Sequence, residues 1–156
     1  IESFAELGLN MEFVQDNHYK KKKGVLRGLH FQTKNVQGKL VRVTRGAVYD
    51  VAVDLRTNSP TFGEWYGVLL TEKNKIMFYV PEGFAHGFLT LEDDTEFLYK
   101  CTNLYSPEHD SGLRWNDPTI NIDWKFEEFN ITEEDLTISD KDKVQQLFDK
   151  SSIYFE

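Results

Sequence analysis

Residues 47–55 read AVYDVAVDL, and this stretch indicates the fold most directly. Its odd-numbered positions are all apolar, whereas two of its even-numbered positions carry Asp50 and Asp54. Side chains alternate between two faces along a β-strand, so this spacing predicts a strand with one core face and one wetter face.

Similar short runs rich in Val, Leu, Phe and Tyr lie on both sides of this stretch, separated by Gly, Asn, Pro and Asp. The expected strands are Val25–Gln32, Lys39–Thr44, Ala47–Leu55, Glu64–Leu70, Lys75–Val80, Gly87–Leu91 and Glu96–Thr102. Many short strands with regular turn signals are typical of an all-β sandwich or barrel.

Helical patterns occur only near the two ends. Ile1–Leu9 has apolar residues at helix-like spacing. At the other end, Ser139 followed by Asp142 is a variant of the capping box, and 144–148 places three apolar residues on one helical face. The charge run Lys20–Lys23 is expected to be a solvated turn.

Composition limits the classes of protein to consider. The 156 residues are 40% hydrophobic, which fits a single domain spanning 1–156. The chain has 18 Lys and Arg residues and 26 Asp and Glu residues, which gives a net charge of −8. This charge disfavours duplex nucleic acid and anionic membranes as partners. We see neither a membrane-length apolar run nor a secretory leader, so a cytoplasmic location is expected. The single Cys101 excludes an intrachain disulfide.

Two histidines lie in contexts that suit chemistry, His30 in GVLRGLHFQ and His86 in VPEGFAHGF. In an unbroken strand Arg27 and His30 would face opposite sides, but a bulge at Gly28 would turn both into one cavity. Spacing alone favours the alternative, a core histidine bonded to the backbone beside a surface arginine.

A metal site is disfavoured, because barrels that bind transition metals usually present His-x-His followed by a carboxylate. Here Gln32 and Lys34 occupy those positions. Acid/base chemistry fits better, since a neutral imidazole is the usual base near neutral pH. Tyr99, Lys39 and Asp142 are candidate partners, although each also has an ordinary structural explanation. The residues alone thus predict a β-barrel that could hold a metal-free histidine site.

Several segments, in order, resemble the dTDP-4-dehydrorhamnose 3,5-epimerase family: GVLRGLHFQ, GKLVRVTRGAVYDVAVDLRTNSPTFGEW, VPEGFAHGF, YKCTNLYSPEHDSGLRWNDPTINIDW and LTISDKD. The resemblance implies a cupin-type jelly roll with short peripheral helices, including one near the C-terminus. It also implies a homodimer without a cofactor. The implied reaction converts dTDP-4-dehydro-6-deoxy-D-glucose to dTDP-4-dehydro-L-rhamnose, in dTDP-rhamnose biosynthesis for cell-surface polysaccharide.

The resemblance also assigns catalytic roles. His30 matches the family's base, and Asp142, in SDKD, matches the aspartate that pairs with it. Tyr99, in FLYKC, matches the proposed general acid, and Lys39, in GKLV, matches the lysine near the keto oxygen of the sugar.

The remaining matched positions are implied to bind substrate. They are Arg27, Gln15, Asn17, His86 and Tyr105. Family members usually begin with an F-x-E segment and an arginine that help to bind the nucleotide, and this sequence starts after them. We therefore expect the amino-terminal edge of the domain to be incomplete, or completed by a partner.

Three alternative functions remain open at this point. A related enzyme could epimerise only C3 or only C5 of a dTDP-4-keto sugar. A sugar-binding cupin would have the same fold with an inert site. A metal-dependent cupin oxygenase would require bound iron, and the ligand pattern disfavours it.

Overall fold

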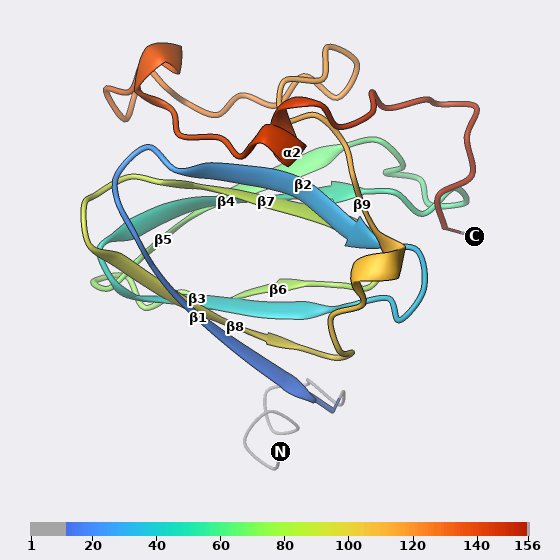
Figure 1. Ribbon diagram of the computed structural model, residues 1–156, viewed down its shortest axis with the longest axis horizontal. Coiled ribbons are helices and arrows are strands. Elements are labelled where there is room, and N and C mark those ends of the chain that lie inside the picture. The colour runs from blue at the N-terminus through green and yellow to red at the C-terminus, as the bar shows by residue number, and fades with distance from the viewer. Residues whose placement is uncertain (1–11, 156) are drawn as a thin grey trace.

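The computed structural model describes residues 12–155, and Figure 1 shows two antiparallel β-sheets lying face to face. The strands are β1 (Gln15–Lys21), β2 (Leu26–Gln32), β3 (Lys39–Arg45), β4 (Ala47–Asp54), β5 (Trp65–Thr71), β6 (Phe78–Val80), β7 (Phe84–Thr90), β8 (Thr95–Cys101) and β9 (Asp110–Gly112). The helices of the described part are short: η1 (Pro107–His109), η2 (Glu133–Asp135) and α2 (Asp140–Lys143). The expected all-β jelly-roll sandwich is confirmed.

One sheet has four strands in the order β1-β8-β3-β6, and the other has five in the order β5-β4-β7-β2-β9. Strand β7 begins at Phe84, three residues before the expected start, so that His86 lies within it. None of the helices in residues 12–155 is long and apolar enough to cross a bilayer.

Apolar side chains form two layers. The smaller layer lies between the sheets and takes its buried residues from both: Val41, Val43, Val48, Leu70, Phe88 and Phe97. The larger layer lies on the outer face of the five-stranded sheet, where the C-terminal segment covers it (Figure 1). That segment contributes Leu113, Ile120, Trp124, Ile131 and Phe148. The five-stranded sheet is therefore buried on both faces.

This layering corrects the expectation of a wetter face on β4, because every residue of Ala47–Asp54 is buried. The odd-numbered apolar residues pack under the C-terminal segment. Asp50 and Asp54 are both at most 1% exposed. Asp50 Oδ1 pairs with His86, and Asp54 accepts hydrogen bonds from Arg56, Ser59 and Thr61. A buried carboxylate needs such partners. The two aspartates of β4 are therefore buried and paired with protein groups, and they do not face solvent.

The C-terminal helix is shorter than the apolar pattern predicted. Ser139 caps it as expected, accepting a hydrogen bond from the Asp142 amide, but the helix ends at Lys143. Val144 is 74% exposed and only Phe148 of the expected apolar face is buried. The chain extends here because Gln146 pairs with Leu113 in an isolated bridge. The helix expected over Ile1–Leu9 lies outside the described residues.

Two strands were not expected from the sequence. Strand β1 runs through QDNHYKK and includes Lys20 and Lys21, which were assigned to a turn. It lies at an edge of the four-stranded sheet and is polar on both faces. Strand β9 lies within the SPEHDSG segment and pairs with β2. Both strands turn out to supply walls of a cavity.

Candidate active site

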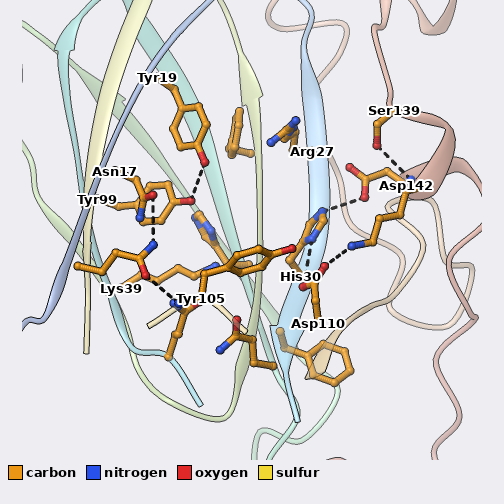
Figure 2. Close-up of a pocket in the computed structure, with 17 residues that line it drawn as sticks. Asn17, Tyr19, Arg27, His30, Lys39, Tyr99, Tyr105, Asp110, Ser139 and Asp142 are labelled. Carbon is orange, nitrogen blue, oxygen red and sulfur yellow. Dashed lines mark hydrogen bonds and ion pairs between the residues drawn. The ribbon is translucent and has the colours of Figure 1, made fainter. Parts of the chain in front are cut away.

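A cavity of about 460 Å³ lies between the two sheets. All nine residues singled out from the sequence line it: Gln15, Asn17, Arg27, His30, Lys39, His86, Tyr99, Tyr105 and Asp142. Its volume is within the range of small-molecule sites. Figure 2 shows that its polar side chains come from both sheets and from α2.

The backbone of β2 departs from a regular strand at Gly28. The pairing register with β7 shifts between Arg27 and His30, and both side chains line the cavity. Gly28 has φ +134°, and a Cβ there would lie 2.7 Å from the Gly87 Cα atom. Only glycine fits this conformation and this close approach. The bulge expected at Gly28 is confirmed, together with its effect on the two side chains.

His30 is paired with Asp142. Its Nε2 atom lies 2.8 Å from Asp142 Oδ1, and only 1% of the Asp142 side chain is exposed. Asp142 Oδ2 accepts a hydrogen bond from the Gly28 amide at 3.3 Å. The Ser139 cap fixes the first turn of α2. The carboxylate is thus held from two directions and in turn orients the imidazole (Figure 2).

The surroundings of His30 favour its protonated form. Burial lowers the pKa of His30, but Asp110 and Asp142 beside the ring raise it more, so the pKa lies above its ordinary value. Burial raises the pKa of Asp142, but the contact with His30 outweighs burial and the pKa falls below its ordinary value. An ionised Asp142 can therefore stabilise an imidazolium formed on His30.

His86 forms a second, more deeply buried pair. Its Nε2 atom lies 2.7 Å from Asp50 Oδ1, and the two side chains are 5% and 0% exposed. His86 lies directly opposite His30 in the pairing of β2 with β7. The edge of its ring faces Tyr99, with centroids 6.4 Å apart. His86 lines the cavity on the side of the five-stranded sheet.

The four-stranded sheet brings Tyr99 and Lys39 to the facing wall. The Tyr99 hydroxyl lies 3.2 Å from that of Tyr19, and the two rings stack. Burial raises the pKa of Tyr99, and the hydrogen bond with Tyr19 raises it further. Lys39 Nζ lies 5.6 Å from the centroid of the Tyr99 ring, and burial lowers its pKa. Tyr99 therefore stays protonated and can donate a proton.

The rim of the cavity is held by amide side chains. Gln15 Oε1 accepts a hydrogen bond from the Tyr105 amide at 2.7 Å, and Gln32 Oε1 accepts one from the Ser106 amide. Asn17 donates from Nδ2 to the buried Cys101 Sγ atom at 3.7 Å. Tyr105 is 53% exposed, and Figure 2 shows it between Lys39 and His30. These contacts hold three amide side chains in place on the lining of the cavity.

Sequence reasoning missed several lining residues, of which Asp110, Lys141 and Tyr19 carry the most chemistry. Asp110 and Tyr19 lie on strands that the pattern did not predict, and Lys141 precedes Asp142 in α2. The only available signal for Lys141 was its place inside the matched segment LTISDKD. In residues 12–155, no three or more His, Cys, Asp or Glu side chains form a group that could hold a metal ion.

The arrangement can move protons on opposite sides of a bound molecule. The His30–Asp142 pair lies on the wall of the five-stranded sheet, and Tyr99 lies on the wall of the four-stranded sheet. A base on one side and an acid on the other can remove a proton from one face of a carbon and return one to the other face.

Known proteins share both the sequence and the fold. The model of the family described as dTDP-4-dehydrorhamnose 3,5-epimerase matches residues 1–150. A relative with that name from Methanothermobacter thermautotrophicus is 54% identical over 151 residues, which are 97% of this chain and 80% of the relative.

Two crystal structures show the same architecture. That of dTDP-4-dehydrorhamnose 3,5-epimerase from Elizabethkingia anophelis superimposes with a TM-score of 0.88 at 50% identity, over 98% of this chain and 82% of the other. That of dTDP-6-deoxy-D-glucose-3,5-epimerase from Legionella pneumophila, in complex with dTDP-4-keto-L-rhamnose, has a TM-score of 0.86 at 47% identity, over 94% and 75%. The chain therefore belongs to the dTDP-4-dehydrorhamnose 3,5-epimerase family.

Proposed function

We propose that this chain epimerises C3 and C5 of dTDP-4-dehydro-6-deoxy-D-glucose, giving dTDP-4-dehydro-L-rhamnose, in dTDP-rhamnose biosynthesis. The observation that carries the proposal is the His30–Asp142 pair facing the Tyr99 hydroxyl across one cavity. Family membership supports the same reaction. The Legionella relative, which binds dTDP-4-keto-L-rhamnose, supports the substrate class.

The first step removes a proton from a carbon next to the C4 ketone. His30 takes the proton, and the electron pair of the C–H bond moves into the enolate, whose charge gathers on the C4 oxygen. Asp142 stabilises the imidazolium that results. Lys39 lies on the facing wall and supplies a donor to the enolate oxygen, which lowers the barrier to this step.

The second step returns a proton to the same carbon from the opposite face. Tyr99 donates its hydroxyl proton to the carbon as the enolate reverts to the ketone. The phenolate then regains a proton from solvent, and the His30 imidazolium releases one to solvent. Delivery on the opposite face inverts the centre. Positioned acid/base groups supply roughly 10²–10⁴-fold of the rate, and stabilisation of the enolate must supply much of the rest. This chemistry requires no cofactor, because the ketone itself accepts the electron pair.

The other five residues matched by the family resemblance bind the substrate. Arg27 presents a planar guanidinium suited to the diphosphate oxygens. Gln15, Asn17 and Tyr105 lie where the nucleotide would enter, and His86 would contact the sugar. A local set of cations in this cavity binds the anion although the chain as a whole carries a net charge of −8.

The proposal extends to the assembly and the location of the enzyme. The chain acts as one domain, forms a homodimer and works in the cytoplasm. Sedimentation equilibrium tests the homodimer, which predicts twice the mass of the chain. A monomer at micromolar concentration that turns over its substrate contradicts this part of the proposal.

Proton NMR in D₂O tests the reaction. With dTDP-4-keto-6-deoxyglucose as substrate, we expect solvent deuterium to replace the protons at both C3 and C5. Exchange at one centre only indicates a single-centre epimerase. If the substrate binds and neither proton exchanges, the chain is a sugar-nucleotide-binding cupin and the catalytic proposal is wrong.

A further inference from the structure

We propose that Asp110 is a positioning residue for the base His30, acting from the side of the imidazole opposite Asp142, and that Lys141 controls how strongly it acts. The inference rests on the proposed function, because it gives His30 the role of base. Neither Asp110 nor Lys141 was among the residues that the sequence suggested for the site.

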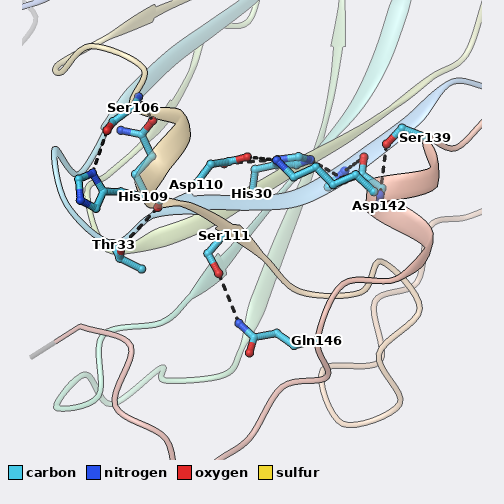
Figure 3. A network of polar contacts seen from close by, with 12 residues as sticks. His30, Thr33, Ser106, His109, Asp110, Ser111, Ser139, Asp142 and Gln146 are labelled. Carbon is cyan, nitrogen blue, oxygen red and sulfur yellow. Dashed lines mark hydrogen bonds and ion pairs between the residues drawn. The ribbon is translucent and has the colours of Figure 1, made fainter.

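Two carboxylates bracket the imidazole of His30. Asp142 Oδ1 lies 2.8 Å from Nε2, and Asp110 Oδ1 lies 3.8 Å from Nδ1. Figure 3 shows the ring between them. Both acids are almost fully buried, with 7% of the Asp110 side chain and 1% of the Asp142 side chain exposed. At such burial the charge of each carboxylate is weakly screened and acts strongly on the ring.

The fold fixes Asp110 at this place. Strand β9 pairs with β2, with His30 opposite Gly112 and Gln32 opposite Asp110. Asp110 is thus a diagonal neighbour of His30 in an antiparallel ladder, and such neighbours are within reach of each other's side chains. The Leu29 and Leu113 backbones exchange two hydrogen bonds of 2.9 Å beside this pair, which keeps the two segments in register.

The two carboxylates have different roles because their distances differ. Asp142 contacts Nε2 at hydrogen-bonding distance and fixes the ring, whereas 3.8 Å is too long for a hydrogen bond. Nδ1 therefore remains free to accept a proton from the substrate. Once Nδ1 is protonated, the imidazolium stands between two negative charges. Asp110 thus favours the state that proton abstraction creates, without occupying the nitrogen that reacts.

Lys141 moderates this effect. It forms an ion pair with Asp110 Oδ2, and its side chain is 55% exposed. Burial raises the pKa of Asp110, but His30 and Lys141 lower it below its ordinary value, so Asp110 stays ionised. Lys141 directly precedes Asp142 in α2, so one helical turn supplies the partner of His30 and the partner of Asp110.

The ionisable groups facing His30 come from every element around it. They are Asp110 on β9, Lys141 and Asp142 on α2, Lys39 on β3, and His86 opposite it on β7. Lys39 opposes protonation of His30, Asp110 and Asp142 favour it, and Lys141 offsets the charge of Asp110 through their ion pair. Removing Asp110 and removing Lys141 should therefore move the titration of His30 in opposite directions, which a general loss of structure would not do.

The test is the pH titration of His30 in ¹⁵N-histidine-labelled protein, with the pH dependence of kcat/KM as a second readout. We expect Asp110→Asn to lower the apparent pKa by about one pH unit, because one of the two anions is gone. Lys141→Met should raise it by roughly half a pH unit, because Asp110 then acts without compensation. Asp110→Glu should restore most of the wild-type titration.

Asp140→Asn and Lys143→Met are the matched controls, since both residues lie in α2 and pair with each other in solvent. Neither control should move the titration of His30. Shifts of the same sign in Asp110→Asn and Lys141→Met, or no shift in either, overturn the proposal. If Asp110→Asn fails to fold, Lys141→Met decides alone, since an unchanged or lowered pKa contradicts the role of Asp110. The NMR titration needs no substrate, so failure of the proposed reaction is seen separately, as absence of deuterium exchange in the wild type.

Discussion

The wall of the cavity supplied by the five-stranded sheet differs from the wall supplied by the four-stranded sheet in how its ionisable groups are paired. On the first wall, His30 and His86 each contact a buried carboxylate. On the second, Tyr99 and Lys39 pair with no carboxylate among the described residues. Burial there raises the pKa of Tyr99 and lowers that of Lys39, so it favours both neutral forms.

This difference assigns opposite tasks to the two walls. Carboxylates beside an imidazole stabilise its protonated form, so the wall of the five-stranded sheet can accept a proton. On the wall of the four-stranded sheet, burial keeps the phenol of Tyr99 neutral, so it can donate a proton. A sugar ring held between the walls would therefore meet a base on one face and an acid on the other.

Removing the base should abolish the reaction. We expect His30→Ala to lower kcat by about 10⁴-fold, with loss of deuterium exchange at both C3 and C5, because no other group takes the proton. Proton NMR in D₂O measures both. His18→Ala is the control, since His18 is exposed on β1. Normal exchange in His30→Ala would place the base elsewhere.

Neutralising the partner of the base should have the next largest effect. Asp142→Asn keeps an oxygen near His30 but cannot balance the charge of an imidazolium, so kcat should fall by about 10³-fold. A steady-state assay at several pH values measures the change, and Asp140→Asn in the same helix is the control. A wild-type rate in Asp142→Asn would mean that the 2.8 Å contact with His30 is only structural.

Removing the acid should separate proton abstraction from inversion. In Tyr99→Phe, His30 still takes a proton, but none is returned to the opposite face. We expect net epimerisation to fall by about 10²-fold while deuterium exchange without inversion persists. NMR distinguishes exchange from inversion in the same sample, and Tyr66→Phe, at an exposed position of β5, is the control. An equal loss of exchange and inversion would contradict the assignment of separate walls.

The smallest effect on catalysis is expected at the second buried carboxylate of β4. Asp54 accepts hydrogen bonds from Arg56, Ser59 and Thr61 at the turn after the strand. Burial raises the pKa of Asp54, but these hydrogen bonds outweigh burial and hold the pKa well below the ordinary 3.8. The stability that Asp54 contributes is therefore fully present above pH 4 and is lost as the pH falls toward the folded-state pKa.

Asp54→Asn should lower the free energy of unfolding by about 1–3 kcal/mol at pH 7, with unchanged kcat. Urea denaturation at pH 7 and at pH 3 measures the effect, and the difference between variant and wild type should shrink at the lower pH. A variant as stable as wild type at pH 7 would show that these hydrogen bonds add nothing.

Most strands of the fold can be predicted from the alternation of apolar and polar residues in the sequence. The alternation in AVYDVAVDL is strong enough to identify β4, because apolar residues must reach one layer of the core. Strand β1 gave no such signal, since its inward side chains Gln15, Asn17 and Tyr19 line a polar cavity. A strand that faces a site on one side and solvent on the other has no apolar face to detect.

The site was predicted in part, for different reasons at different residues. Gly28 between Arg27 and His30 gave a physical reason for a bulge, and the bulge is present. Asp142 could be assigned only through the family resemblance, because 112 positions separate it from His30 and nothing local joins them. Asp110 lay in a segment that the pattern assigned to a loop. Only the pairing of β9 with β2 brings its carboxylate to the imidazole.

A crystal structure of this chain with a dTDP-linked 4-keto sugar bound would show whether the two walls of the cavity meet opposite faces of the sugar. The quantity to measure is the position of the His30 imidazole and the Tyr99 hydroxyl relative to the plane of the sugar ring. The two-wall account predicts that a His30 nitrogen and the Tyr99 oxygen lie within hydrogen-bonding reach of C3 or C5 on opposite faces, with Lys39 at the keto oxygen. Both groups on the same face of the ring, or a sugar bound outside the cavity, would contradict it.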